Sequence, residues 1–241
     1  MNRTSGEDSG YLKWPDFLQG TLIKRYKRFK ADVRLRNGHV VTALCPNTGS
    51  MMGCAEPGRT VYLSRHNIPS RKLKYTWEII EMPTSLVGIN TLVPNRLVKA
   101  AIMADHIPEL SGFDSIRAEV PYGKNSRVDL LLEQGEEKCF VEIKNCTLLE
   151  GTTACFPDAV TSRGFKHIIE LQGELVSGHR AVMFYLVQRT DATRFRPADH
   201  IDPEYGKALR KAHKKGLEIL AYDVHIDRKG IRINRGLPFD V

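Results

Sequence analysis

Residues 126–145 read SRVDLLLEQGEEKCFVEIKN, and this stretch decides the fold of the second half of the chain. Two runs, Arg127–Leu132 and Lys138–Lys144, flank the polar turn 134–137 and predict a β-hairpin. Because successive side chains of a strand point to opposite faces, the polar residues inside the two runs fall on predictable sides of the hairpin. The stretch therefore predicts a sheet and the position of a polar cluster on it.

Three polar side chains of this hairpin are expected on one face. Glu142 and Lys144 share a face of the second strand with Phe140. Asp129, on the first strand, faces the same way if the hairpin register allows it. Two carboxylates and an ammonium group among apolar residues are costly to desolvate unless they pair or bind an ion. The simple alternative is a salt bridge, from Glu142 to Lys144 or from Asp129 to Arg127.

The spacing D-x12-E-x-K fits the chemistry of a metal-dependent nuclease. Mg²⁺ or Mn²⁺, the expected cofactor, takes oxygen ligands, often one or two carboxylates with water and substrate phosphate. Such an ion polarises the phosphoryl group and activates water, and a nearby lysine neutralises developing charge. We therefore predict Asp129, Glu142 and Lys144 as catalytic residues. Glu119, on the preceding predicted strand, is a further candidate metal ligand beside the first two carboxylates.

The elements around the hairpin predict a mixed sheet flanked by helices. Helices are expected at 94–105, at 159–176 with Asp158 as N-cap, and within 203–215, and strands at 115–120, 181–187, 217–225 and 231–234. Residues 151–157 are expected to form a loop. The strand 181–187 is almost continuously apolar, as in strands buried on both faces. Gln188 follows it as a further polar candidate for the site.

The first part of the chain predicts a small β-barrel. Strands are expected within 21–36 and at 40–44, 61–64 and 74–80, with turns at 37–38, 46–50 and 56–58. Several short strands with closely spaced turns favour a barrel over a helical domain. Residues 81–85 show little strand or helix pattern. We therefore predict a two-domain α+β or α/β protein, with domains at 1–82 and 83–241.

Positive charge is concentrated in the first third of the chain. The whole chain has a net charge of +8, and residues 1–81 carry 14 Lys and Arg against 7 Asp and Glu, a net charge of +7. This asymmetry suggests a polyanion-binding module joined to a nearly neutral one. A surface that is merely soluble is the alternative.

A basic stretch with interleaved aromatic residues is the main candidate for DNA binding. Residues 24–30, KRYKRFK, contain five cations, and as one strand they would present both cations and a ring on an exposed face. An edge strand kept soluble by lysine is the alternative. The predicted DNA-binding residues are Lys24, Arg25, Tyr26, Lys27, Arg28, Arg71, Lys72, Lys74 and, on the helix after the hairpin, Arg163, Lys166 and His167. A solvated helix face explains the last three equally well.

Composition argues against secretion and membrane insertion. No run approaches the roughly 18–20 apolar residues of a membrane span, and MNRTSGEDSG lacks the apolar region of a signal peptide. The five cysteines are not spaced as CxxC, which favours reduced thiols over a disulfide framework or a zinc site. A cytoplasmic protein is expected.

Longer motifs of the chain resemble the sugar fermentation stimulation protein A family. They are GTLIKRYKRF (20–29), CPNTGSM (45–51), LKYTWE (73–78), GINT (88–91), SRVDLLL (126–132), VEIKN (141–145), FPDAVT (156–161), RG (163–164), KH (166–167) and VQR (187–189). The similarity extends from about Leu18 to Pro238. One departure is Phe165, where the family usually has Gln, and it bears on the role of that helix.

The resemblance implies an N-terminal OB-fold and a C-terminal restriction-endonuclease-like domain similar to PD-(D/E)xK nucleases. Its nuclease motif falls on Asp129, Glu142 and Lys144. The resemblance also implies DNA binding and, in enteric bacteria, a role in regulating maltose and other sugar metabolism. Two functions follow as expectations: a DNA-binding protein that acts in regulation, or a Mg²⁺- or Mn²⁺-dependent nuclease whose OB domain presents DNA to the hairpin. A nuclease that cuts both strands would often be a homodimer.

Overall fold

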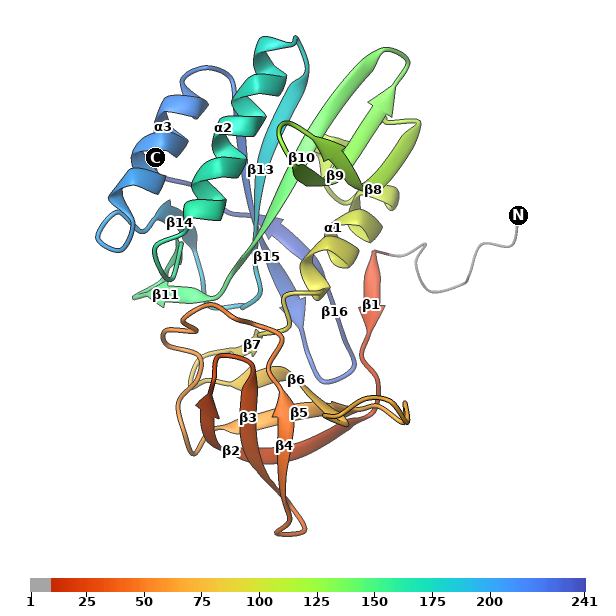
Figure 1. The fold of residues 1–241 in the computed structure, drawn as a ribbon, viewed down its shortest axis with the longest axis vertical. Coiled ribbons are helices and arrows are strands. Elements are labelled where there is room, and N and C mark those ends of the chain that lie inside the picture. The colour runs from red at the N-terminus through yellow and green to blue at the C-terminus, as the bar shows by residue number, and fades with distance from the viewer. Residues whose placement is uncertain (1–9) are drawn as a thin grey trace.

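A closed β-barrel and a larger mixed sheet make up the computed structural model, which describes residues 10–241 (Figure 1). The barrel strands are β2 (Phe17–Tyr26), β3 (Lys30–Leu35), β4 (Val40–Leu44), β5 (Thr60–Arg65) and β6 (Tyr75–Glu81), and β7 (Leu86–Gly88) extends the sheet beyond β6. Pairing of β4 with β6 closes the barrel. Trp77, Leu63 and Ile80 are fully buried inside it. The predicted small barrel is confirmed.

The basic run 24–30 forms a hairpin and not one strand. β2 ends at Tyr26 and β3 begins at Lys30, so the chain reverses between them. Lys27 and Arg28 adopt positive φ angles of 50° and 63°, which suit a tight hairpin turn. No glycine, asparagine or proline marks this turn, and the sequence pattern therefore concealed it. The expectation of one continuous strand face over 24–30 is wrong.

The second domain is built on a seven-stranded sheet. Its strands, in spatial order, are β1 (Tyr11–Lys13), β16 (Gly230–Gly236), β15 (Glu218–Ile226), β13 (Arg180–Val187), β10 (Glu137–Cys146), β9 (Ser126–Gln134) and β8 (Ser115–Tyr122). β13 is parallel to β10 and β15, and the other pairs are antiparallel, so the sheet is mixed as predicted. The domains depart from a division at 82 and 83, because β1 belongs to this sheet and β7 to the barrel sheet.

Helices cover both faces of this sheet (Figure 1). They are α1 (Val93–Met103), α2 (Ser162–Val176) and α3 (Pro203–His213), and a short 3-10 helix, η1 (Pro108–Leu110), follows α1. Cys139, Val141 and Ile143 pack in the core that contains α1. Phe140 packs in the core of α2 and α3. The predicted alternation along β10 is confirmed. No helix within residues 10–241 is long and apolar enough to cross a membrane.

Helix α2 begins later than predicted. Thr161 is its N-cap, and the Thr161 side chain accepts a hydrogen bond from the Gly164 backbone N–H. Asp158, the predicted cap, instead accepts a hydrogen bond from the Met51 backbone N–H of the barrel at 2.9 Å. A tertiary contact between the domains has therefore taken the side chain that the local pattern assigned to the helix.

The predicted loop at 151–157 contains a strand. β12 (Thr153–Phe156) lies between β11 (Leu148–Glu150) and β14 (Arg194–Pro197) in a small second sheet. Each of these strands has only three or four residues. Strands this short carry too little alternation to be recognised, and their pairing depends on the fold around them.

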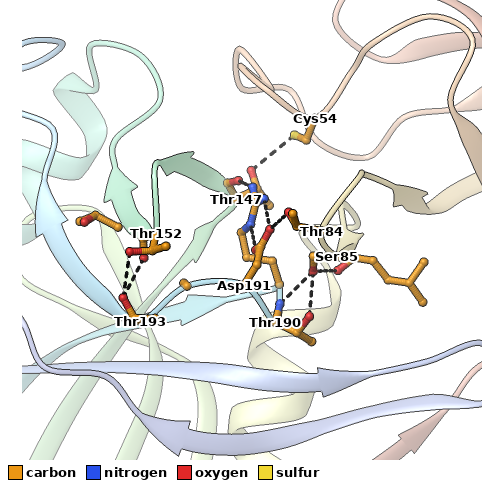
Figure 2. A network of polar contacts seen from close by, with 12 residues as sticks. Cys54, Thr84, Ser85, Thr147, Thr152, Thr190, Asp191 and Thr193 are labelled. Atoms are coloured by element: carbon orange, nitrogen blue, oxygen red, sulfur yellow. Dashed lines mark hydrogen bonds and ion pairs between the residues drawn. The ribbon is translucent and has the colours of Figure 1, made fainter.

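A hydrogen-bond network joins the barrel to the α/β domain (Figure 2). Arg189 donates to Asp191 through Nε at 2.6 Å and Nη2 at 2.8 Å. Asp191 also accepts a hydrogen bond from the Thr84 hydroxyl. The Thr190 backbone N–H donates to Ser85 Oγ at 2.9 Å. These bonds hold the segment between β6 and β7 against the residues that follow β13. The barrel therefore lies next to the sheet at the C-terminal end of β13.

Candidate active site

A cavity of about 350 Å³ lies where β9 and β10 separate, and both domains line it. The barrel contributes residues 47–49 of the loop after β4. The α/β domain contributes the hairpin and the first turns of α2. The charged lining residues and the histidine are Asp129, Glu142, Lys144, Asp158, Arg163 and His167. The structure thus brings the three predicted catalytic residues to one cavity.

Asp129 ends the backbone pairing of the hairpin. The last paired residues on the cavity side are Leu130 and Val141. One step further, the Asp129 carboxylate accepts a hydrogen bond from the Ile143 backbone N–H at 2.7 Å. Its other oxygen accepts from Asn95 Nδ2 of α1, also at 2.7 Å. Because a side chain replaces the ladder here, the strands part and the cavity opens between them.

The Glu142 carboxylate is almost fully buried, with 3% of the side chain exposed. Its Oε1 accepts hydrogen bonds from Lys144 Nζ at 2.7 Å and from His167 Nδ1. Its Oε2 is buried without a hydrogen-bond partner in the described part of the chain. Burial raises the pKa of Glu142, but the bonds from His167 and Lys144 outweigh burial and hold that pKa below its usual value. The salt bridge considered from the sequence is present, and it leaves one carboxylate oxygen free.

His167 is a partner of Glu142 and not a surface cation. Arg163 Nε donates to His167 Nε2 at 3.4 Å, which leaves Nδ1 as the protonated nitrogen that donates to Glu142. Only 6% of the His167 side chain is exposed. His167 is therefore buried at the cavity beside Glu142, and its contact with DNA stays a prediction. Phe165, on the same helix, is 38% exposed and does not line the cavity.

Asp129 is unfavourably placed as an anion. Burial, and then the charge of Glu142, raise the pKa of Asp129 from 3.8 to about 6. The bonds from Ile143 and Asn95 and the charge of Lys144 oppose this rise without cancelling it. A destabilised carboxylate beside a second carboxylate with a free oxygen is a suitable donor set for an oxygen-preferring divalent cation.

A third carboxylate of the cavity, Asp158, was missed as a site residue. The Ser50 hydroxyl donates to the Asp158 backbone carbonyl at 2.6 Å, and the Asp158 carboxylate accepts from the Met51 N–H. These bonds connect the barrel loop to the segment before α2. No group of three or more His, Cys, Asp or Glu within residues 10–241 has the arrangement of a metal site. A metal here would therefore rest on Asp129 and Glu142, with water or phosphate completing its coordination.

Glu119 lies outside the cavity. It is exposed on β8 and lines a neighbouring hollow of about 520 Å³ with Arg127, Arg163 and Lys166. Glu119 meets Asp129 only in a separate hollow beside α1. Glu119 has a positive φ of 54°, and the pairing of β8 with β9 skips Glu119 and Asp129. The structure therefore does not bring the third predicted metal ligand to Glu142, whereas it gathers three cations beside the cavity.

Arg25 has a structural role in the barrel. Its guanidinium group donates to the backbone carbonyls of Asn47, Gly49 and Ser50 at 2.7–3.2 Å. These residues belong to the loop that lines the cavity. Arg25 thus supports that loop, and its contact with DNA stays a prediction.

Most of the other predicted barrel residues lie at one end of the barrel. Exposed there are Lys24, Lys27, Arg28, Lys72 and Lys74. They are close together because Leu44 pairs with Lys30 on one side and with Thr76 on the other. The Tyr26 hydroxyl donates to Asp32 at 3.1 Å, and Arg71 donates to Thr76 at 2.6 Å. Exposed cations therefore gather at this end of the barrel, and their contact with DNA stays a prediction.

Gln188 contacts the cavity indirectly, through a residue that lines it. It is fully buried, and its Nε2 donates to Asn145 Oδ1 at 2.6 Å and to the Asn90 carbonyl at 3.3 Å. Asn145 lines the cavity, whereas Gln188 does not. Gln188 therefore connects the segment after β7 to the end of β10.

Comparison with known proteins identifies both domains. The family model "Sugar fermentation stimulation protein RE domain" matches residues 92–230, and "SfsA N-terminal OB domain" matches residues 23–89. A sugar fermentation stimulation protein homolog of Geotalea uraniireducens is 55% identical over 88% of this chain and 92% of that protein. One of Nitrosococcus oceani is 53% identical over 92% and 96%. The structure of Pyrococcus furiosus SfsA in complex with Ca²⁺ matches with a TM-score of 0.88 at 28% identity, covering 95% of this chain and 98% of that chain. The expected OB-fold and restriction-endonuclease-like domain are confirmed.

Proposed function

The chain belongs to the sugar fermentation stimulation protein family, and we propose that it is a divalent-metal-dependent nuclease that binds DNA across its two domains. One observation carries the proposal. Asp129, Glu142 and Lys144 line a single cavity between the domains, and Glu142 Oε2 is buried there without a partner. A buried anionic oxygen without a partner is costly, and a cation would satisfy it.

The residues present fit Mg²⁺ or Mn²⁺. Asp129 and Glu142 would hold the ion, as two carboxylates commonly do when water and substrate phosphate complete the coordination. When bound, the ion polarises the phosphoryl group and lowers the pKa of the attacking water. The solved relative from Pyrococcus furiosus is a complex with Ca²⁺, another oxygen-preferring cation, which supports a metal site in this family.

The chain's own side chains prepare the site for a phosphodiester. Lys144 keeps its ammonium group at the cavity, where it neutralises negative charge that develops on phosphate oxygens. Arg163 and His167 keep the Glu142 carboxylate in place. The Ile143 N–H and Asn95 hold the Asp129 carboxylate at the opening between the strands. Each group is thus oriented before substrate arrives.

Two cationic surfaces border the cavity and suit the phosphates of DNA. Arg127, Arg163 and Lys166 line the hollow next to it on the α/β domain. On the barrel, the exposed residues Lys27 and Arg28 stand at the hairpin that Arg25 connects to the cavity loop. DNA held by both surfaces would cross the cavity.

The test is cleavage of single-stranded or branched DNA in the presence of Mn²⁺. Wild-type protein should cleave, and Asp129→Ala should abolish cleavage. Glu136→Gln removes a charge from the exposed turn between β9 and β10, at a residue that lines neither the cavity nor the cationic hollow beside it, and should leave cleavage unchanged. Cleavage that survives Asp129→Ala comes from a contaminant and contradicts the proposal.

A second function, DNA binding without cleavage in the regulation of sugar metabolism, is favoured by one contact. Glu142 Oε1 already accepts bonds from Lys144 and His167, so the charged residues partly satisfy one another without metal. On this alternative, wild-type protein binds DNA and cleaves none with any divalent metal.

The nuclease proposal in turn predicts a homodimer on double-stranded DNA, because one cavity per chain serves one strand. Sedimentation of the protein with and without DNA checks this prediction.

A further inference from the structure

A second hollow, of about 770 Å³, lies between the barrel and the turn that joins β15 to β16. It shares no lining residue with the cavity of Asp129. β3 runs from Lys30, at the basic hairpin, to Leu35, which lines this hollow. At about 3.4 Å per residue, the two places lie roughly 17 Å apart along the strand. The hollow is therefore at the opposite end of the barrel from the cations described above.

Aromatic rings form the wall of this hollow. The Phe17 ring lies 5.9 Å from the Tyr62 ring and 5.8 Å from the Trp14 ring, measured between centroids. Tyr62 is 6% exposed, and its hydroxyl donates to Glu81 at 3.2 Å. Trp14 Nε1 donates to the Asp227 carbonyl at 3.0 Å. Trp14 and Tyr62 are thus held by hydrogen bonds next to Phe17, whose partly exposed ring is the apolar surface of the hollow.

Three exposed cations surround these rings. They are Arg36, Arg228 and Lys229. None forms an ion pair within residues 10–241, and Arg36 donates only to a neutral glutamine side chain. Asp227, the acidic residue of the hollow, accepts from the backbone N–H groups of Lys229 and Gly230 at 2.6 and 2.9 Å. The loop backbone thus engages Asp227 Oδ1, and in the described part of the chain Asp227 forms no ion pair with any of the three cations.

Rings beneath unpaired cations suit a ligand that combines flat apolar groups with negative charge. We propose that this hollow binds one or two nucleotides of a single DNA strand. A base stacks against Phe17, and the phosphates contact Arg36 and Arg228, as in other single-strand sites that combine aromatic and basic residues. The volume is within the range of small-ligand pockets. This site goes beyond the proposed nuclease centre and shares with it only the DNA ligand.

The charge contribution is tested by fluorescence polarisation with labelled dT12 in EDTA, where cleavage cannot contribute. Arg36→Gln combined with Arg228→Gln should weaken binding about tenfold and reduce the slope of log affinity against log salt by about 1.4, because two phosphate contacts to a single strand are lost. Arg34→Gln combined with Arg232→Gln removes the same charge from exposed positions outside the hollow. That control should stay within about twofold of wild type. Equal losses in both double variants would overturn the proposal.

The base contribution needs its own variant and ligand. Phe17→Leu keeps an apolar side chain and removes the ring, so dT12 binding should weaken about fivefold or more. Binding of an abasic 12-mer, which keeps the phosphates, should not change, and circular dichroism confirms folding. Loss of affinity for both ligands alike would exclude stacking on Phe17.

A direct readout is photocrosslinking with 5-iododeoxyuridine in the oligonucleotide. Crosslinked peptides should contain Phe17, and crosslinks confined to residues 24–30 would overturn the site. Thymidine monophosphate should compete far less well than dT12 at equal nucleotide concentration, and equal competition would reject a strand as the ligand. The polarisation measurements are made in EDTA and need no cleavage, so a failure of the proposed nuclease function leaves these tests intact.

Discussion

Asp129 is a carboxylate whose ionisation opposes folding in the absence of metal. Its pKa is about 6 in the folded protein, against 3.8 for an aspartate in water. Because the folded-state pKa is raised, its contribution to stability is fully present below about pH 4 and is lost as the pH rises through 6. Asp129→Asn should therefore stabilise the metal-free protein at pH 8 by up to about 3 kcal/mol. Urea unfolding in EDTA at pH 4, 6 and 8 measures this.

The same variant also tests the metal. Mn²⁺ should raise the free energy of unfolding of wild-type protein at pH 8, because a ligand that binds only the folded state stabilises it. Asp129→Asn should show little of this increase, since one carboxylate ligand is gone. An Asp129→Asn variant that is destabilised in EDTA would contradict the inference that ionisation of Asp129 opposes folding. A variant that Mn²⁺ stabilises as much as wild type would contradict the role of Asp129 as a metal ligand.

His167 donates a hydrogen bond that favours the ionised form of Glu142. Only a side chain that can donate the same hydrogen bond should replace His167 without loss of stability. His167→Leu removes a hydrogen bond to a buried carboxylate, which should cost about 2 kcal/mol at pH 7. His167→Asn can place an amide N–H where Nδ1–H was and should recover most of that stability. Chemical denaturation of both variants decides the point. The loss in His167→Leu should shrink as the pH falls and Glu142 is protonated, because its lowered pKa stabilises the fold only above about pH 4.5.

At the scale of elements, the hairpin between β2 and β3 combines structural and exposed cations. Arg25→Gln should lower the melting temperature, since several backbone carbonyls lose a charged donor, at a cost of about 2 kcal/mol. Lys27→Glu with Arg28→Glu should leave the melting temperature unchanged and weaken DNA binding at least tenfold at low salt. Thermal unfolding and polarisation on the same samples separate the two roles. Unchanged DNA affinity in the double variant would remove the hairpin from the binding surface.

The helices and strands also show which elements can be predicted from sequence patterns and which cannot. β9 and β10 followed from two apolar runs and a polar turn, and the helices were placed to within a few residues, because their burial patterns are local. The turn at Lys27 and Arg28 was hidden because it lacks the usual turn residues. Alternation failed at Asp129, where Val128 and Leu130 pack in different cores although they are two positions apart on one strand. Local sequence does not contain the contact with Ile143 that makes this irregularity.

At the scale of the whole molecule, the contacts between the domains are expected to couple their unfolding. Tyr62 and Ile79 of the barrel belong to the same buried cluster as α1. Arg189→Met breaks a nearly buried ion pair with Asp191 and should reduce the free energy of unfolding by about 3 kcal/mol. Thr193→Val, at an exposed polar pair with Thr152 in the same region (Figure 2), should change it by less than about 0.5 kcal/mol.

Calorimetry of these two variants gives a further whole-molecule readout. Because cores and hydrogen bonds cross the junction, the wild-type protein should unfold in one transition. Arg189→Met should shift that transition downward. Two separate wild-type transitions, or equal shifts in Arg189→Met and Thr193→Val, would mean that the junction does not couple the domains.

The sequence by itself determined the two fold classes, the hairpin and the choice of Asp129, Glu142 and Lys144 as candidate site residues, because alternation, turns and motif spacing are local properties. The family resemblance, likewise contained in the sequence, named both folds. Only the tertiary structure decided which groups meet. It brought His167 to Glu142 and Asp158 to the barrel loop, kept Glu119 out of the cavity and used Arg25 to support a loop. These contacts join residues from different elements, and their positions depend on how sheet, helix and barrel pack, which no local pattern encodes.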